Sequence, residues 1–160
     1  MSTVLPVTLA TFPATRVAYM RYTGPFGAPV GQFWQTRMYP FMLAHHLLHH
    51  TRYGISLDDP EITEPARCRY DACVEVSDAF VATGDALIAT LPGGRYAVCP
   101  FSGTSDTIPD AWRAVLREWI PESGLQLDNR PLLEMYGPTS TYDPATGVFT
   151  CDICLPVAPL

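Results

Sequence analysis

A glutamate among large side chains, in Leu132-Leu133-Glu134-Met135-Tyr136, is the strongest candidate for chemistry in this 160-residue sequence. In a strand, Leu133 and Met135 point to one face, and Leu132, Glu134 and Tyr136 to the other. We expect the first face to pack on a helix and the second to line a groove. There a partly desolvated carboxylate would attract a cation, or take a raised pKa and exchange protons. The alternative is an ordinary solvent-facing glutamate.

Aromatic residues elsewhere in the chain are candidates for the same groove, because aromatic faces bind flat apolar molecules and cations. Tyr136 is the best of them, since it shares a face with Glu134. The others fit an ordinary hydrophobic core equally well; they are Tyr19, Trp34, Tyr96, Trp119 and Phe149.

Asp71 is a candidate for a second carboxylate in the groove. It lies on the polar face of a strand predicted at 67–76, as the approximate counterpart of Glu134 in the first half of the chain. The competing interpretation is an aspartate that stabilises an edge or a turn within Arg69-Tyr70-Asp71.

Metal-ligating residue types are present, but their spacing does not favour a metal site. His45/His49 and His46/His50 are spaced i,i+4, as a helix can use to bind a metal, but no third ligand is evident nearby. Cys151 and Cys154 lie three apart in a predicted strand and therefore point to opposite faces. A glycine-rich phosphate loop is also lacking. We predict no metal and no cofactor.

The composition excludes several classes of function. Sixteen acidic and ten basic residues give a net charge of −6, and the basic residues, all arginine, are scattered, so direct nucleic-acid binding is disfavoured. No apolar run approaches the length of a membrane span, and the N-terminus does not resemble a signal peptide. Five cysteines without a disulfide framework favour reduced thiols and a cytoplasmic location.

A repeated signature indicates two copies of one unit. Pro13-x-x-Arg16-x-Ala18 followed by Gly24 recurs as Pro92-x-x-Arg95-x-Ala97 followed by Gly103, 79 residues later (92 minus 13). Periodicity and turn residues predict a strand, a helix and two strands in each half. The predicted strands cover 7–23, 53–57, 67–76, 95–102, 131–136 and 148–157, and the predicted helices cover 30–50, with a kink at Pro40, and 106–119.

The fold class we predict is therefore α+β. Duplicated strand–helix–strand–strand units form one antiparallel sheet, with two helices on one face and a ligand groove on the other. The whole chain, 1–160, is expected to be a single domain with pseudo-repeats at about 5–78 and 85–157.

The order of several short motifs resembles the GyrI-like family, also called the AraC-type effector-binding (multidrug-binding) domain. These motifs are Gly24-Pro25-Phe26, Asp58-Asp59-Pro60, Cys68-Arg69-Tyr70-Asp71-Ala72-Cys73, Pro92-Gly93-Gly94-Arg95-Tyr96-Ala97-Val98 and Glu134-Met135-Tyr136. The resemblance runs nearly end to end and leaves no room for a helix-turn-helix module. It implies a stand-alone member.

The resemblance implies binding of small lipophilic, often cationic, compounds in a central groove. Glu134 coincides with the glutamate of the family's E-x-Y motif, which contacts ligand in multidrug-binding members. Two alternatives stay open. One is a hydrolase of cyclopropane-containing genotoxic compounds with Glu134 and Tyr136 as catalytic residues; the other is an inhibitor that interacts with DNA gyrase or a regulator.

Overall fold

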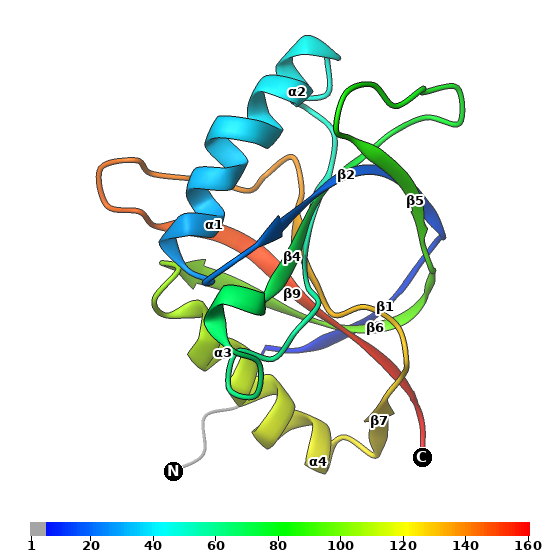
Figure 1. The fold of residues 1–160 in the computed structure, drawn as a ribbon. Helices are drawn as coiled ribbons and strands as arrows, with labels where there is room; N and C mark the ends of the chain where they lie inside the picture. Colours follow the sequence, from blue (N-terminus) through cyan, green and yellow to red (C-terminus); the bar gives the residue numbers. More distant parts are fainter. Residues whose placement is uncertain (1–5) are drawn as a thin grey trace. The chain divides into compact units, whose positions relative to one another are not determined.

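The computed structural model describes residues 6–160, and within them the chain forms two compact units. One unit spans 14–92, and the other combines 93–160 with the first strand (Figure 1). The α+β class predicted from the sequence is confirmed, because each unit combines antiparallel strands with one helical segment. Residue 5, near which we expected the first repeat to begin, lies outside the described residues.

The 14–92 unit contains four strands in the order β3-β4-β2-β5. They are β2 (Thr15–Thr23), β3 (Arg52–Ser56), β4 (Arg69–Glu75) and β5 (Leu87–Leu91). Alternate residues of β4, namely Tyr70, Ala72 and Val74, are buried against the helical segment, as the apolar face of this strand predicts.

The 93–160 unit repeats this arrangement with an additional strand. Its order is β1-β6-β9-β8, and β7 also pairs with β9. The strands are β1 (Thr8–Phe12), β6 (Gly94–Gly103), β7 (Leu125–Leu127), β8 (Leu133–Tyr136) and β9 (Phe149–Pro159). β1, which precedes the first copy of the signature, pairs with β6 of the 93–160 unit. β5, which precedes the second copy, pairs with β2 of the 14–92 unit.

The helical segments share an irregularity that prolines explain. α1 (Ala28–Phe33) and α2 (Tyr39–Ala44) are joined by a π-helical turn, Trp34–Met38, and follow one another in Figure 1. α3 (Ile108–Ala114) and α4 (Ile120–Glu122) are joined in the same way by Val115–Trp119.

Each π-helical turn ends just before a proline. Tyr39 donates its N–H to the carbonyl of Trp34, five residues back, directly before Pro40. Ile120 donates to the carbonyl of Val115 directly before Pro121. Proline lacks an N–H and crowds the carbonyl four residues back, and the wider turn accommodates both effects. The helix therefore continues past Pro121, where the sequence predicts that it ends.

Candidate functional site

Glu134 lies on β8 and points toward the helical segment of its own unit. It is opposite Ile153 of β9, which is in turn opposite Cys99 of β6. Directly opposite residues share a face of a sheet, and Ile153 and Cys99 are buried against α3. The predicted face of Glu134 and Tyr136 is therefore wrong. The strand alternates as predicted, but the two faces are exchanged. Glu134 and Tyr136 lie on the helix-covered side, and Leu133 and Met135 lie on the other.

Two hydrogen bonds hold the Glu134 carboxylate. The Tyr136 hydroxyl donates to Oε2 at 2.7 Å, and the Trp112 indole Nε1 of α3 donates to Oε1 at 3.4 Å. Burial raises the pKa of Glu134, while the bonds from Tyr136 and Trp112 oppose that rise because they stabilise the ionised form. Among the described residues, no arginine forms an ion pair with this carboxylate. The site thus holds an acidic group without a positive counter-charge.

Aromatic rings pack on the same side of the sheet as this carboxyl group. The Tyr136 ring lies 6.2 Å from that of Phe149, measured between centroids, and Phe149 lies 5.5 Å from Phe101. Trp112 and Trp119 pack on the same buried cluster. This arrangement combines a desolvated acid with apolar walls, which can hold a lipophilic cation through charge and through ring faces.

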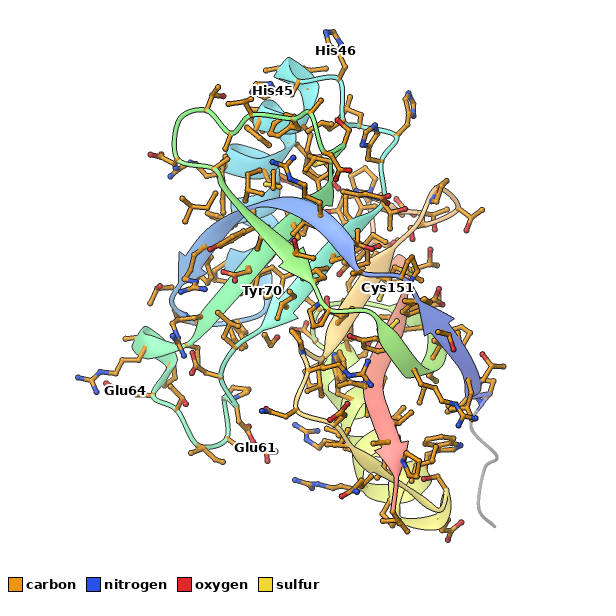
Figure 2. The ribbon with its side chains drawn as sticks, turned by 90° about the vertical axis from the view of Figure 1, so that its right-hand side faces the viewer. His45, His46, Glu61, Glu64, Tyr70 and Cys151 are labelled. Carbon is orange, nitrogen blue, oxygen red and sulfur yellow. The ribbon has the colours of Figure 1, made fainter. Side chains whose placement is uncertain are left out.

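Cys151 of β9, labelled in Figure 2, lies near enough to Glu134 for that carboxylate to act on its thiol. Its thiol is buried, and its pKa is raised first by desolvation and then by the charge of Glu134. A hydrogen bond with Tyr136 acts on the pKa of the thiol in the opposite direction. The thiol is therefore a neutral, compact group beside the carboxylate.

The 14–92 unit fills the equivalent position differently. Met20, Ala72 and Gly54 lie opposite one another on β2, β4 and β3, as Cys99, Ile153 and Glu134 do on β6, β9 and β8. By this register Gly54 corresponds to Glu134, and Tyr70 corresponds to Cys151.

Tyr70 of β4, labelled in Figure 2, fills this second position. The Trp34 indole Nε1 donates to the Tyr70 hydroxyl at 3.1 Å, where Trp112 donates to Glu134 in the other unit. A Cβ atom on Gly54 would lie 1.9 Å from that hydroxyl oxygen. A tyrosine and a glycine thus occupy the space that a cysteine and a glutamate occupy in the 93–160 unit.

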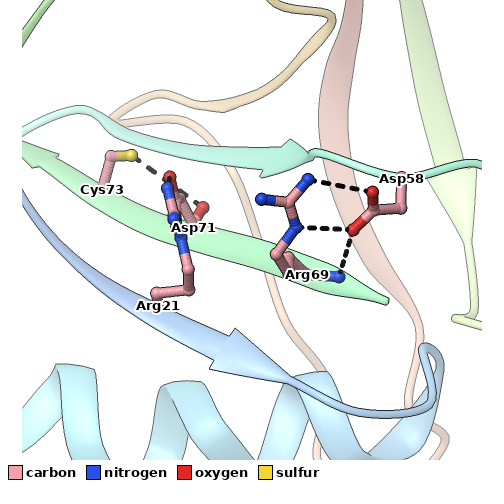
Figure 3. A network of polar contacts seen from close by, with 5 residues as sticks. All are labelled: Arg21, Asp58, Arg69, Asp71 and Cys73. Carbon is pink, nitrogen blue, oxygen red and sulfur yellow. Dashed lines mark hydrogen bonds and ion pairs between the residues drawn. The ribbon is translucent and has the colours of Figure 1, made fainter. Parts of the chain in front are cut away.

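Asp71 is not the counterpart of Glu134 that we expected. It lies on β4, which matches β9 rather than β8, and its side chain is engaged by Arg21 of β2 at 2.8 and 3.1 Å (Figure 3). Arg69 forms a second bidentate pair with Asp58, which lowers the pKa of that carboxyl group. Asp71 is 7% exposed and fully paired, so the geometry favours the stabilising role over a ligand role.

The remaining aromatic candidates do not all gather at Glu134. Trp119 and Phe149 belong to its cluster. Trp34 lies in the core of the 14–92 unit, and Tyr19 of that unit is opposite Cys73, away from the helix-covered face. Tyr96 is buried beside Phe12 at 5.2 Å and under the Arg130 guanidinium at 4.8 Å, on the face of β6 opposite that of Cys99.

Trp112 and Cys151 are the site residues that sequence reasoning missed. Trp112 is not among the candidates named from the sequence. The signal that could have found it is its position 78 residues after Trp34, one residue short of the repeat offset of 79. Cys151 is considered from the sequence only for its spacing to Cys154.

The histidines and cysteines do not form a metal site in residues 6–160, where no group of three or more histidine, cysteine, aspartate or glutamate residues is placed to hold an ion. His45 packs against Phe41 and Phe80, and His50 Nδ1 lies 2.7 Å from the carbonyl oxygen of Glu75. All five cysteines are buried free thiols. Over the same residues, no helix has the length and apolar character required to cross a bilayer.

Comparison with known proteins decides the family. The model of the GyrI-like small molecule binding domain matches residues 5–158, nearly the whole chain. The chain belongs to this family. One relative of this GyrI-like chain is the SPbeta prophage-derived protein YosT of Bacillus subtilis (strain 168), which is named as a candidate transcriptional regulator. It is 29% identical over 133 residues. That match covers 82% of this chain and 89% of YosT.

Solved structures share the GyrI-like fold. The C-terminal domain of EcmrR superposes with a TM-score of 0.74 at 13% identity, covering 99% of this chain and all of that domain. SAV2435, solved bound to tetraphenylphosphonium, has a TM-score of 0.59 at 16% identity, covering 96% of this chain and 94% of that protein. At these identities, the likeness establishes the fold.

Proposed function

We propose that this GyrI-like chain binds a small lipophilic cation, and that Glu134 of the 93–160 unit supplies the recognising charge. The observation that carries the proposal is a desolvated carboxylate, held by Trp112 and Tyr136, that has no cationic partner among the described residues. Burying an acid without a counter-charge costs stability, and an arriving cation removes that cost.

The surroundings favour an aromatic or apolar cation over a small inorganic one. Phe101, Phe149 and Trp119 present ring surface on the same side of the sheet. Ring faces attract organic cations and also bury their apolar substituents. A hydrated metal ion would need several more oxygen ligands than this single carboxylate provides.

The direct test is titration with tetraphenylphosphonium, the compound bound to the structurally similar SAV2435. Saturable binding to this chain is expected by calorimetry or fluorescence. Glu134→Gln keeps the shape of the side chain and removes its charge, so affinity should fall about tenfold or more. Glu75→Gln, at an exposed position on β4, is the matched control and should bind as the wild type does. Equal affinity of Glu134→Gln and the wild type would overturn the proposal.

Hydrolysis of a strained ring is the second candidate, because the 2.7 Å contact between the Tyr136 hydroxyl and Glu134 pairs an acid with a hydroxyl that can relay a proton. Mass spectrometry of a cyclopropane-containing compound after incubation separates the two functions. Release of a ring-opened, hydrated product by the wild type but not by Glu134→Gln supports turnover. Recovery of the unchanged compound supports binding alone.

A further inference from the structure

The opposite face of the same strands bears a second carboxylate, Asp152, beside a cavity that shares Phe101 and Cys151 with the surroundings of Glu134. Asp152 of β9 lies opposite Pro100 of β6 and Met135 of β8, whereas its neighbour Ile153 lies opposite Cys99 and Glu134. Adjacent residues of a strand point to opposite faces. Asp152 therefore points away from α3 and from the Glu134 site.

An open cavity of about 360 Å³ surrounds this position. Three segments of the 93–160 unit form it: β6, the start of β9 and the loop after β8. The lining is Pro100, Phe101, Ser102, Gly137, Thr139, Ser140, Thr150, Cys151 and Asp152. Ligand sites usually span about 300–1,000 Å³, so this volume suits a compact ligand.

The chemistry of the lining differs from that around Glu134. Four hydroxyl side chains, Ser102, Thr139, Ser140 and Thr150, accompany the carboxylate. Hydroxyls both donate and accept hydrogen bonds, while an ionised carboxylate only accepts. Within residues 6–160, no hydrogen bond or ion pair involves the Asp152 carboxylate, unlike Asp71, which is held by Arg21. The Asp152 carboxylate is therefore a negatively charged hydrogen-bond acceptor that is available to a ligand.

We propose that this cavity is a second binding site, for a hydroxylated primary amine such as an amino sugar. The ammonium group would donate to Asp152, and the ligand hydroxyls would exchange hydrogen bonds with Ser102, Thr139 and Ser140. The Thr150 hydroxyl already accepts a hydrogen bond from the Thr141 N–H at 2.8 Å. A quaternary cation has no N–H with which to bond the carboxylate. A divalent metal would require further carboxylates, and no three-ligand group exists in the described part of the chain.

The test compares three probes by titration of the full chain at low salt, followed by two-dimensional NMR. Glucosamine carries both the ammonium and the hydroxyls, glucose carries only hydroxyls, and tetramethylammonium carries only charge. Glucosamine should bind saturably and shift the amide signals of 100–102, 137–140 and 150–152. Glucose and tetramethylammonium should bind about tenfold more weakly or not at all. Glucose lacks the ammonium group that would donate to Asp152, and tetramethylammonium lacks both an N–H and hydroxyls.

Variants assign the binding to the carboxylate. Asp152→Asn should weaken glucosamine binding about tenfold or more, and its NMR spectrum reports whether the fold is retained. Asp106→Asn, an exposed aspartate of the same unit, is the matched control and should bind normally. Glu134→Gln should also bind glucosamine normally, which separates this site from the proposed cation site.

Three results would overturn the second site. They are absence of saturable glucosamine binding, binding of glucose with equal affinity, and unchanged affinity in Asp152→Asn. Loss of glucosamine binding in Glu134→Gln would also overturn it, because the amine would then occupy the Glu134 site. Failure of tetraphenylphosphonium to bind would not by itself decide the glucosamine result, since the two carboxylates, Asp152 and Glu134, point to opposite faces of the sheet and are tested by separate variants.

Discussion

At the scale of single residues, two opposing effects act on the Glu134 carboxyl group. Desolvation raises its pKa, and the hydrogen bonds from Tyr136 and Trp112 lower it by stabilising the anion. Because desolvation is the largest effect, the free protein keeps its proton at higher pH than an exposed glutamate does. A cation bound at the proposed site would favour the anion, so we expect its binding to release this proton.

Affinity for tetraphenylphosphonium should therefore rise with pH through the raised pKa of Glu134 and then level off. Trp112→Phe keeps a ring but removes the N–H that stabilises the anion, so the midpoint of this rise should move to higher pH. Binding constants measured by calorimetry across a pH series test both statements. A flat profile in the wild type, or an unmoved midpoint in Trp112→Phe, would contradict the assignment of the charge to Glu134.

The same pKa affects stability in a defined direction. The folded protein binds the Glu134 proton more tightly than the unfolded chain, so its contribution to stability is largest at low pH. That contribution declines as pH rises from the unfolded to the folded pKa. Glu134→Gln cannot lose a proton, so without ligand its Tm should exceed that of the wild type most clearly above neutral pH. Thermal unfolding at acidic and alkaline pH checks this, and a lower Tm at alkaline pH would contradict it.

At the scale of elements, the lack of a side chain at Gly54 on β3 determines which group packs at this position of the 14–92 unit. Its missing side chain admits the Tyr70 hydroxyl, which Trp34 then binds. Gly54→Ala places a Cβ against that hydroxyl and should destabilise the fold by about 1–3 kcal/mol. Gly31→Ala in α1 meets nothing within 4 Å and should stabilise by about 0.5–1 kcal/mol. Denaturant unfolding of both variants measures the contrast, and equal effects would refute the packing argument.

Elements were predictable from the sequence where local chemistry determines them. The apolar face of β4 and the strand that ends at Tyr136 follow from periodicity. The end of the helix at Pro121 was predicted wrongly, because a π-helical turn lets the helix continue to Glu122. The face to which Glu134 points was not predictable, because alternation defines two faces without saying which one a helix covers. The pairings of Glu134 with Trp112 and of Asp71 with Arg21 depend on cross-strand register, which turn composition alone does not determine.

At the scale of the whole molecule, the two units share an element order and differ in what fills one equivalent position. In each, a long strand is followed by a helical segment and then by further strands, and a tryptophan indole N–H of the helical segment donates toward the sheet. The repeated signature and this shared order support our proposal that the chain arose by duplication. The acceptor is a neutral tyrosine in one unit and a glutamate in the other, so only one unit offers a charge at that position.

This asymmetry predicts one tetraphenylphosphonium per chain rather than two. The position in the 14–92 unit is closed by Tyr70 and lacks a carboxylate, and its nearby acid, Asp71, is already neutralised by Arg21. Calorimetric titration should give a stoichiometry near one. Tyr70→Ala opens space without adding charge, so it should leave both stoichiometry and affinity near those of the wild type. A second equivalent that survives in Glu134→Gln would mean that the 14–92 unit recognises the cation by other groups, and would refute the role assigned to the glutamate.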